Sequence, residues 1–233
     1  MLLPIVPASY GDFNVTLAGG MNITLSTLLA SEGWDEVSTP VIYVTGNVGS
    51  TSTATPALIC DVENARIVVE PGVYISGKGG NGGNGYITAT DTDATAGEDG
   101  GPAISATELC HLSNSGTIQG GGGGGGGGWG FFDTVKVSGD GGGGGAGLNV
   151  GSGGIGGGDD GNYNGTDGND GTLTAGGAYK DHSGAGGDPG EAGEVASTAG
   201  GRQRKAGGAS GESINGYSLV TYSGAGDLLG PTA

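Results

Sequence analysis

The apolar positions of the first 75 residues follow the short periods of strands and of one helix. In NITLSTLLASEGW (22–34), Ile and Leu residues have helical spacing and Gly33 follows as a stop signal, which predicts a short amphipathic helix over about 22–32. The runs TPVIYVTGNV (39–48) and ARIVVEPGVYI (65–75) are rich in β-branched and aromatic residues and are bounded by Pro, Gly and Asn. These two runs therefore predict strands.

The same kind of pattern returns later in the chain. PALICDVENARIVVEPGVYISGKGGNGGNG (56–85) and PAISATELCHLSNSGTIQGGGGGGGGG (102–128) share an order: Pro-Ala, an apolar run with one cysteine, an asparagine, an isoleucine strand and a glycine block. A repeated strand-then-glycine unit predicts stacked layers. Near the C-terminus, two short β-type runs in 213–226 flank Asn215-Gly216, a strong turn signal.

Glycine changes the picture of the middle of the chain. Of 60 glycines, 6 lie in residues 1–70, 50 in residues 71–212 and 4 in residues 213–233, and nine are consecutive at 120–128. Such blocks suit either a disordered linker or rods that pack by backbone alone, in the extended polyglycine helix with about 3.1 Å rise per residue. Because two of the blocks follow the same strand pattern, we favour packed rods. The dense blocks are 77–85, 120–128, 139–147 and 151–158, with more dilute glycine through 200–211.

The sequence therefore predicts a mainly β or irregular fold with little α-helix. We expect a β-rich N-terminal part over residues 1–70, to which the family resemblance described below assigns the role of attachment. A layered sandwich of polyglycine-II helices over 71–212 is expected to carry the binding surface, and strands over 213–233 to close the fold.

Charge and cysteine content limit the kinds of partner and cross-link that the chain is expected to have. The formal net charge is −17, which argues against nucleic acid as a partner and against passive docking on an anionic membrane, so we expect no nucleic-acid partner. No signal peptide or membrane span is expected, because Met1-Leu2-Leu3 is followed by proline and no long apolar run occurs. Cys60 and Cys110 are too few for a disulfide scaffold and are expected to be buried thiols.

The sequence motifs that could indicate catalysis or ligand binding match their patterns only in part. GVYISGKG (72–79) lacks the final Ser or Thr of a P-loop and precedes no helix. DGNYNG (160–165) starts like a calcium loop, but its twelfth position is Gly171, and the sequence leaves open whether calcium binds at 160–171. His111 and His182 have no zinc spacing, and no pair of carboxylates is singled out. We therefore predict no catalytic residue, no metal, no cofactor and no enzymatic activity.

Aromatic and basic residues between the glycine blocks are the candidate binding residues. They are Trp129, Phe131, Phe132, Tyr163 and Tyr179, together with Arg202, Arg204 and Lys205 of GRQRKAGG (201–208). Loops on a rigid scaffold are where binding residues concentrate, and this residue mix is typical of binding loops. Two plainer interpretations remain open: the aromatics plug the ends of the rods, and the basic loop balances charge.

Four segments carry a resemblance to a known family. SEGWDEVSTPVIYVTGNV, VYISGKGGNGGNG, SNSGTIQGGGGGGGGG and INGYSLVTYSGAGDLLG resemble, in order, the layout of glycine-rich adhesins of tailed bacteriophages. Ser31-Glu32-Gly33-Trp34 and Ala65-Arg66 depart from that layout. The architecture is similar to that of the T-even-type long-tail-fibre adhesins, which implies an attachment domain followed by polyglycine helices with variable receptor-binding loops.

The resemblance implies a virion protein at the distal end of a tail or tail fibre. Its expected partners are a bacterial surface receptor, either an outer-membrane protein or a polysaccharide, and other phage tail or fibre proteins. Whether the chain forms a homotrimer or a single cap on another fibre stays open. The alternatives are a tailspike-like polysaccharide depolymerase and a purely structural component of the tail fibre.

Overall fold

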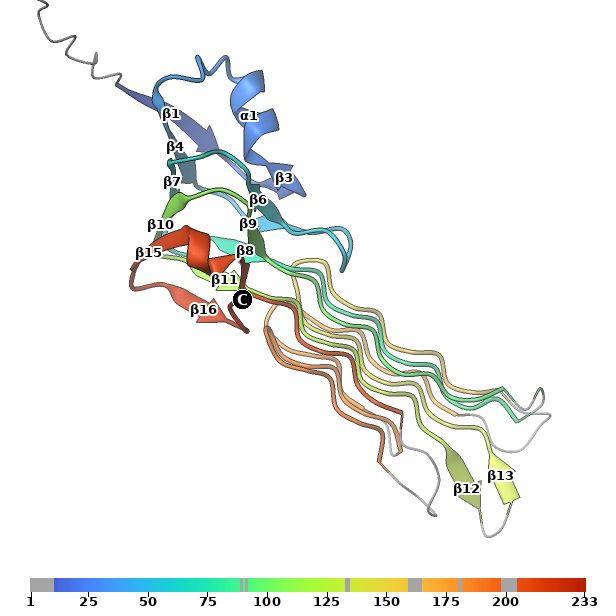
Figure 1. Cartoon of the computed structure of the whole chain (residues 1–233). Helices are drawn as coiled ribbons and strands as arrows, with labels where there is room; N and C mark the ends of the chain where they lie inside the picture. Colours follow the sequence, from blue (N-terminus) through green and yellow to red (C-terminus); the bar gives the residue numbers. More distant parts are fainter. Residues whose placement is uncertain are drawn as a thin grey trace, which may run out of the picture.

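The strands wind around three faces, and each of the first four turns of the chain adds one strand to each face, while the last adds strands to two of them (Figure 1). The computed structural model describes residues 11–88, 90, 92–132, 135–158, 165–179, 182–197 and 205–233. Sheet A contains β1 (Asp12–Leu17), β4 (Thr39–Val44), β7 (Ala65–Val69), β10 (Cys110–Asn114) and β15 (Val220–Gly224). Sheet B contains β2 (Gly20–Met21), β5 (Val48–Gly49), β8 (Tyr74–Ser76), β11 (Thr117–Gln119) and β16 (Asp227–Leu229). Sheet C contains β3 (Ile23–Thr24), β6 (Leu58–Cys60), β9 (Ile104–Ala106) and β14 (Ile214–Asn215).

The chain visits sheets A, B and C in that order on every turn, and all pairs within them are parallel. The result is a three-sided β-solenoid, and the predicted stacked layers are confirmed. α1 (Leu25–Ser31) lies in the first connection from sheet C to sheet A. It is shorter than the predicted helix over 22–32, because Ile23 and Thr24 pair with sheet C as β3. The last such connection holds the short 3-10 helix η1 (Tyr217–Leu219). Neither of these described helices has the length or apolar character needed to cross a membrane.

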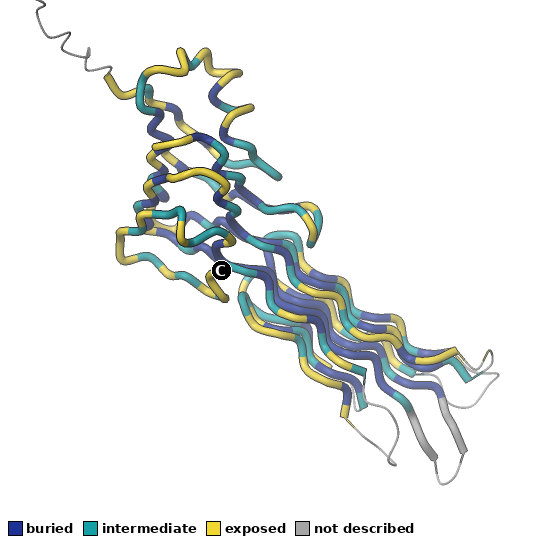
Figure 2. The backbone as a smooth tube through the Cα atoms, in the orientation of Figure 1, coloured by how far each residue is buried: buried dark blue, intermediate teal, exposed yellow. Residues whose placement is uncertain are grey.

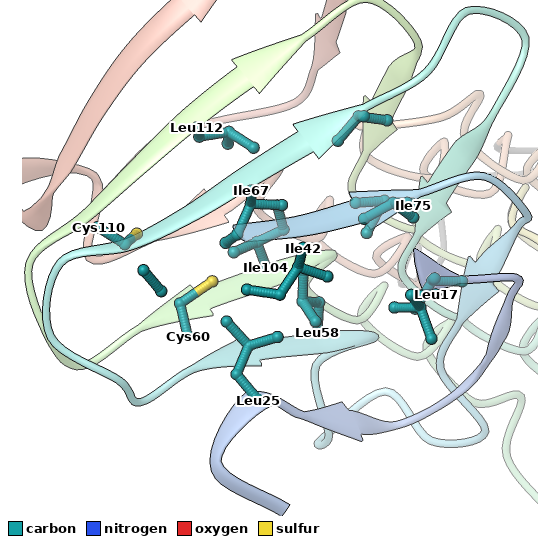
Figure 3. Packing of buried hydrophobic residues seen from close by; sticks show 14 of the residues in the cluster. Leu17, Leu25, Ile42, Leu58, Cys60, Ile67, Ile75, Ile104, Cys110 and Leu112 are labelled. Atoms are coloured by element: carbon teal, nitrogen blue, oxygen red, sulfur yellow. The ribbon is translucent and has the colours of Figure 1, made fainter. Parts of the chain in front are cut away.

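Columns of apolar side chains fill the solenoid. Alternate residues of a strand point to opposite faces, so parallel stacking in register aligns the inward residues of successive turns. In sheet A one inward column runs Val15, Ile42, Ile67 and Leu112, and in sheet C another runs Ile23, Leu58, Ile104 and Ile214. Figure 3 shows residues of both columns facing one another across the core. Each fully buried side chain of this size contributes about 1.5–3 kcal/mol, so stacking the turns stabilises all of them together.

Cys60 and Cys110 also project into this core (Figure 3), and both are buried free thiols, as predicted. A hydrogen bond with Cys110, together with burial, raises the pKa of the Cys60 thiol well above its ordinary value. The two cysteines are not equivalent positions of the repeat, however. Cys110 lies opposite Ala65, whereas Cys60 lies opposite Ala106.

The glycine-rich segments are enlarged connections at a single corner of the solenoid. The connection from sheet B to sheet C is short after β2 and spans residues 50–57 after β5. After β8 it grows to residues 77–103, and after β11 it spans residues 120–213. These two long connections form a bundle that extends away from the solenoid (Figure 1). Apart from the hairpin of β12 (Gly130–Phe132) and β13 (Val135–Val137), the described part of the bundle contains no named helix or strand.

The nine-glycine block lies in the buried middle of this bundle (Figure 2). Its hydrogen bonds repeat every third residue. Its N–H groups donate toward three neighbouring segments. The pairs are Gly121–Gly101, Gly124–Glu98 and Gly127–Thr95 toward the first, Gly122–Ala146, Gly125–Gly143 and Gly128–Asp140 toward the second, and Gly123–Glu191 and Gly126–Glu194 toward the third. Its carbonyl groups accept from three further segments at 80–86, 184–190 and 208–211. Every face of the block is therefore occupied by another backbone.

Close packing explains why this block is all glycine. At each position from 120 to 128, an added Cβ would overlap the backbone carbonyl of a neighbouring segment. None of these glycines has a positive φ. Glycine is therefore required here by the approach of the neighbouring backbones and not by its freedom to adopt left-handed conformations.

Segments with an exposed side tolerate other residues there. In 77–85 the non-glycine residues are Lys78, Asn81 and Asn84, every third position. Ser152 and Ile155 follow the same spacing in 151–158, and the next position, Gly158, has open space where a Cβ would be. Every third residue of a segment points to the same side. A side that packs against another segment must be glycine, whereas a side that faces solvent can carry other residues.

Side-chain oxygens satisfy many N–H groups along the flanks of the bundle. Asn81 Oδ1 and Asn84 Oδ1 accept from Ser152 N and Ile155 N at 3.0 and 2.9 Å. Four aspartates play the same role: Asp170 for Gly153 N, Asp167 for Gly156 N, Asp188 for Gly176 N and Asp99 for Ala209 N. Much of the acidic character of the middle of the chain therefore serves to complete backbone hydrogen bonding.

Candidate functional site

The candidate site is the distal end, defined as the end of the bundle far from the solenoid, where β12 and β13 lie (Figure 1). Hydrogen bonds place several segment ends at one level. Tyr86 N donates to Gly128 O, Gly139 N donates to Tyr86 O, and Gly157 N donates to Gly139 O. Gly165 N in turn donates to Gly157 O. The connections that leave these ends therefore start from a common platform.

Tyr86 and Trp129 form the aromatic part of that platform. Their rings are stacked, with centroids 4.1 Å apart and planes 13° from parallel. Tyr86 is only 1% exposed, whereas Trp129 is half-buried at the exit of the nine-glycine block. Offset stacking of this kind contributes roughly 0.5–1.5 kcal/mol beyond area burial. The pair fixes the start of the chain that leads into β12.

Polar contacts tie the neighbouring turns together. Thr88 Oγ1 lies 3.2 Å from Ser138 Oγ, and Ser138 Oγ donates to Gly158 O at 2.9 Å. Ile87 and Thr92 form an antiparallel bridge that closes the turn between them. These contacts anchor the base of the β12–β13 hairpin to the connections on either side of it.

Asp140 links two further segment ends. Its Oδ1 accepts hydrogen bonds from Thr166 N and Thr166 Oγ1, and its Oδ2 lies 4.0 Å from His182 Nδ1. Within the described ranges, no group of three or more His, Cys, Asp or Glu residues could hold a metal ion. The start of the calcium-loop motif, 160–164, lies outside those ranges, while Asp167 and Asp170 accept backbone hydrogen bonds.

The predicted binding residues fall in different places. Trp129 stacks on Tyr86, and Phe131 and Phe132 lie in β12, opposite Lys136 and Val135. Tyr179 is 55% exposed, and Lys205 is half-exposed with its carbonyl accepting from Ala196 N. Tyr163, Arg202 and Arg204 lie outside the described residues.

Sequence reasoning missed Tyr86, Thr88 and Ser138 as parts of this end. A signal for Tyr86 was present, because it directly follows the three-residue repeat GNGGNG, as Trp129 directly follows the nine glycines. The contact between Thr88 and Ser138 joins residues fifty positions apart and has no local signature.

Two comparisons with known proteins both point to adhesins of phage tail fibres. The family model described as "Phage tail fibre adhesin Gp38" matches residues 12–233. A solved chain from the gp37-gp38 adhesin tip complex of the bacteriophage S16 long tail fiber is similar, with a TM-score of 0.60 and 25% sequence identity. The match covers 96% of this chain and 82% of that chain. No curated protein matches the chain.

Proposed function

The chain belongs to the phage tail fibre adhesin Gp38 family, and we propose that its receptor-binding surface is the distal end. As a member of this family it is a non-enzymatic receptor-binding adhesin at the tip of a long tail fibre. The proposed contact residues are Trp129, Phe131, Phe132, Tyr163, Tyr179, Arg202, Arg204 and Lys205. The observation that carries the proposal is the shared platform of segment ends from which these loops depart.

We further infer that the glycine-rich segments are polyglycine-II helices. The support is the hydrogen-bond period of three residues in 120–128, with donors directed to three neighbours and no positive φ. A helix with three residues per turn and no internal hydrogen bonds has this pattern. Such rods would hold the distal loops in place before a receptor arrives, which lowers the ordering cost of binding.

The opposite end of the solenoid is the proposed attachment surface. β1, β2 and β3 are the outer strands of sheets A, B and C, so each sheet presents one open edge there. Open edges pair readily with strands of another chain. Since the similar S16 chain was solved in a complex with gp37, we propose a gp37-like fibre protein as the partner of this edge. Residues 1–70 then form the attachment part, 71–212 the receptor-binding part and 213–233 the closing strands.

The test of the distal surface compares two tyrosine changes with a matched control. Changing Tyr163 and Tyr179 to serine removes two aromatic contacts from the proposed surface, and we expect adsorption of phage to host cells to fall about tenfold or more. Tyr74→Ser, in sheet B, removes the same group elsewhere and should leave adsorption unchanged. The melting temperature of the purified chain should stay close to that of the parent in the double variant. Unchanged adsorption of the double variant would refute the assignment.

A further inference from the structure

The outward face of sheet A carries the strongest unexplained feature of the solenoid. In-register stacking forms two outward rows on this face. One row runs Asn14, Val41, Arg66, His111 and Thr221, and the next runs Thr16, Tyr43, Val68, Ser113 and Ser223. Arg66 and His111 are direct neighbours on β7 and β10, and both are exposed. Two nitrogen-bearing side chains thus lie side by side on a flat face.

A shallow groove runs beside these two residues. Its volume is about 360 Å³, and it is lined by Arg66, Ile67, Val68, His111, Ser113 and Ser223. Ser113 and Ser223 provide hydroxyl groups, while the half-buried Val68 provides apolar floor. The groove therefore combines strong donors, hydroxyl groups and an apolar patch.

The Arg66 guanidinium is held in place but retains free donor capacity. Its Nη1 lies 3.4 Å from Asp12 Oδ2, across Val41, which is only 2% exposed although it points outward. A guanidinium carries five N–H groups in a planar fork. Among the described residues the Arg66 side chain contacts Asp12, which leaves most of these groups available for a bound carboxylate or phosphate, the groups that this fork matches best.

The charge of the whole chain makes this position unusual. The chain has only 7 Lys and Arg residues against 24 Asp and Glu. The strands β7, β10 and β15 carry no Asp or Glu, and the carboxylate that contacts Arg66 is Asp12 on the edge strand β1. An anionic ligand approaching the solenoid would find its complementary charge here.

We propose that this groove binds an anionic sugar unit through its carboxylate or phosphate group. The Arg66 fork and the His111 ring hold the anion, and Ser113 and Ser223 contact sugar hydroxyls. Tyr43, 38% exposed and one strand beyond Val68, offers a ring face for the apolar side of a sugar. Bacterial surface polysaccharides carry such units, so the groove gives the solenoid a lateral contact separate from the distal end. The proposal does not depend on the assignment of the distal loops.

The two histidines allow a direct test on the full chain. His111 borders the groove, whereas His182 lies at the distal end and is an internal reference. Galacturonic acid provides the carboxylate and glucose 6-phosphate the phosphate, with galactose and glucose as neutral controls. All titrations are run at constant ionic strength, because salt screens exposed charges. We expect a saturable shift of the His111 proton NMR signal with one or both anionic sugars, an unmoved His182 signal, and no shift with the neutral sugars.

Variants identify the contribution of the guanidinium. Arg66→Gln should weaken binding about tenfold or more, since hydrogen bonds to charged groups are the strong ones. Lys78→Gln removes the same charge from the bundle and should leave binding unchanged. Asp12→Asn removes the competing carboxylate and should tighten binding. A shift with galacturonic acid alone identifies a carboxylate ligand, and one with glucose 6-phosphate alone a phosphate. The proposal is overturned if neither anion shifts His111, if Arg66→Gln binds like the parent chain, or if neutral sugars shift it equally.

Discussion

At the scale of single residues, packing against backbone decides what each position of the bundle tolerates. Gly124 and Gly158 are both glycines of the glycine-rich part, yet their surroundings are opposite. A Cβ at Gly124 would overlap the carbonyl of Asn81, whereas a Cβ at Gly158 would meet nothing within 4 Å. A carbonyl that is itself hydrogen-bonded within the bundle cannot move aside without breaking its bonds.

We therefore expect Gly124→Val to prevent folding or to lower the melting temperature by roughly 10 °C or more, the range of severe core overpacking. Gly158→Ala should shift it by no more than about 2 °C. Thermal unfolding followed by circular dichroism measures both. A Gly124→Val chain that melts like the parent would show that the rods do not pack by backbone contact.

Asp35 gives the solenoid a local acid sensitivity. Its carboxylate accepts hydrogen bonds from Ser38 N, Val37 N and Ser38 Oγ, and these bonds lower its pKa, the backbone bond from Ser38 most strongly. A lowered folded-state pKa means that the stabilisation is present above the unfolded pKa and is lost as the pH falls through the folded one. The turn at 35–38 should therefore loosen only in acid, below about pH 4.

Trp34 reports this loosening, because its indole Nε1–H donates to Ser38 O at 2.8 Å. In a chain with Trp129→Phe, the fluorescence of Trp34 should change only below about pH 4, the ordinary pKa of an aspartate, while the far-ultraviolet circular dichroism stays constant. Asp35→Asn removes the titrating carboxylate and should abolish this change. The explanation fails if the asparagine variant titrates like its parent.

At the scale of elements, strands and the helix could be predicted from sequence, but their partners could not. The runs at 39–48 and 65–75 became β4, β5, β7 and β8, because alternation and β-branched residues report a half-buried extended chain. The Asn215-Gly216 turn is also present, with Gly216 at φ 80°, yet the strands on its two sides enter different sheets. The sequence pattern of a segment indicates whether it forms a strand or a helix. Which strand it pairs with depends on residues a full turn of the solenoid away.

The same limit applied to the rods. Dense glycine blocks and the more dilute glycine through 200–211 could be recognised, but the segment 95–101, with glycine at three of its seven positions, joins the same hydrogen-bond network and was not singled out. Such flanking segments need glycine only on the faces that meet a neighbour. The distal contacts, such as Thr88 with Ser138, depend on which rods lie adjacent, and no local sequence signal carries that information.

A three-residue period in 77–85 predicts how insertions behave. Inserting Asn-Gly-Gly after Gly80 puts the new asparagine, Asn81 and Asn84 all on the exposed face, so we expect a folded chain with a modest loss of stability. Inserting one glycine at the same place turns both asparagines toward a packed face, where a Cβ overlaps neighbouring carbonyls. The single insertion should therefore lower the melting temperature more than the triple one. The opposite ranking would contradict a helix with three residues per turn.

At the scale of the whole molecule, the proposed attachment edge and the proposed receptor-binding end lie far apart on one structure. The solenoid turns in a fixed A, B, C order, and the bundle grows from the corner between sheets B and C (Figure 1). Changes to distal loops therefore leave the solenoid strands and their open edges untouched. This arrangement lets the receptor-binding residues vary without affecting the surface proposed to hold the fibre.

The open edge of β1 provides the last test, because one residue there can be changed without breaking sheet A. Thr45 N donates to Leu17 O, so the backbone N–H and C=O of Leu17 point toward β4. Those of the preceding residue, the exposed Thr16, point the opposite way, toward the open edge. Thr16→Pro removes that edge donor and adds a ring that hinders pairing with another strand. We expect this variant to fold and to bind host cells as a purified chain, but to lose co-purification with the fibre protein of the same phage. Thr16→Val keeps the N–H and should assemble normally. Normal assembly of the proline variant would place the fibre contact on another surface.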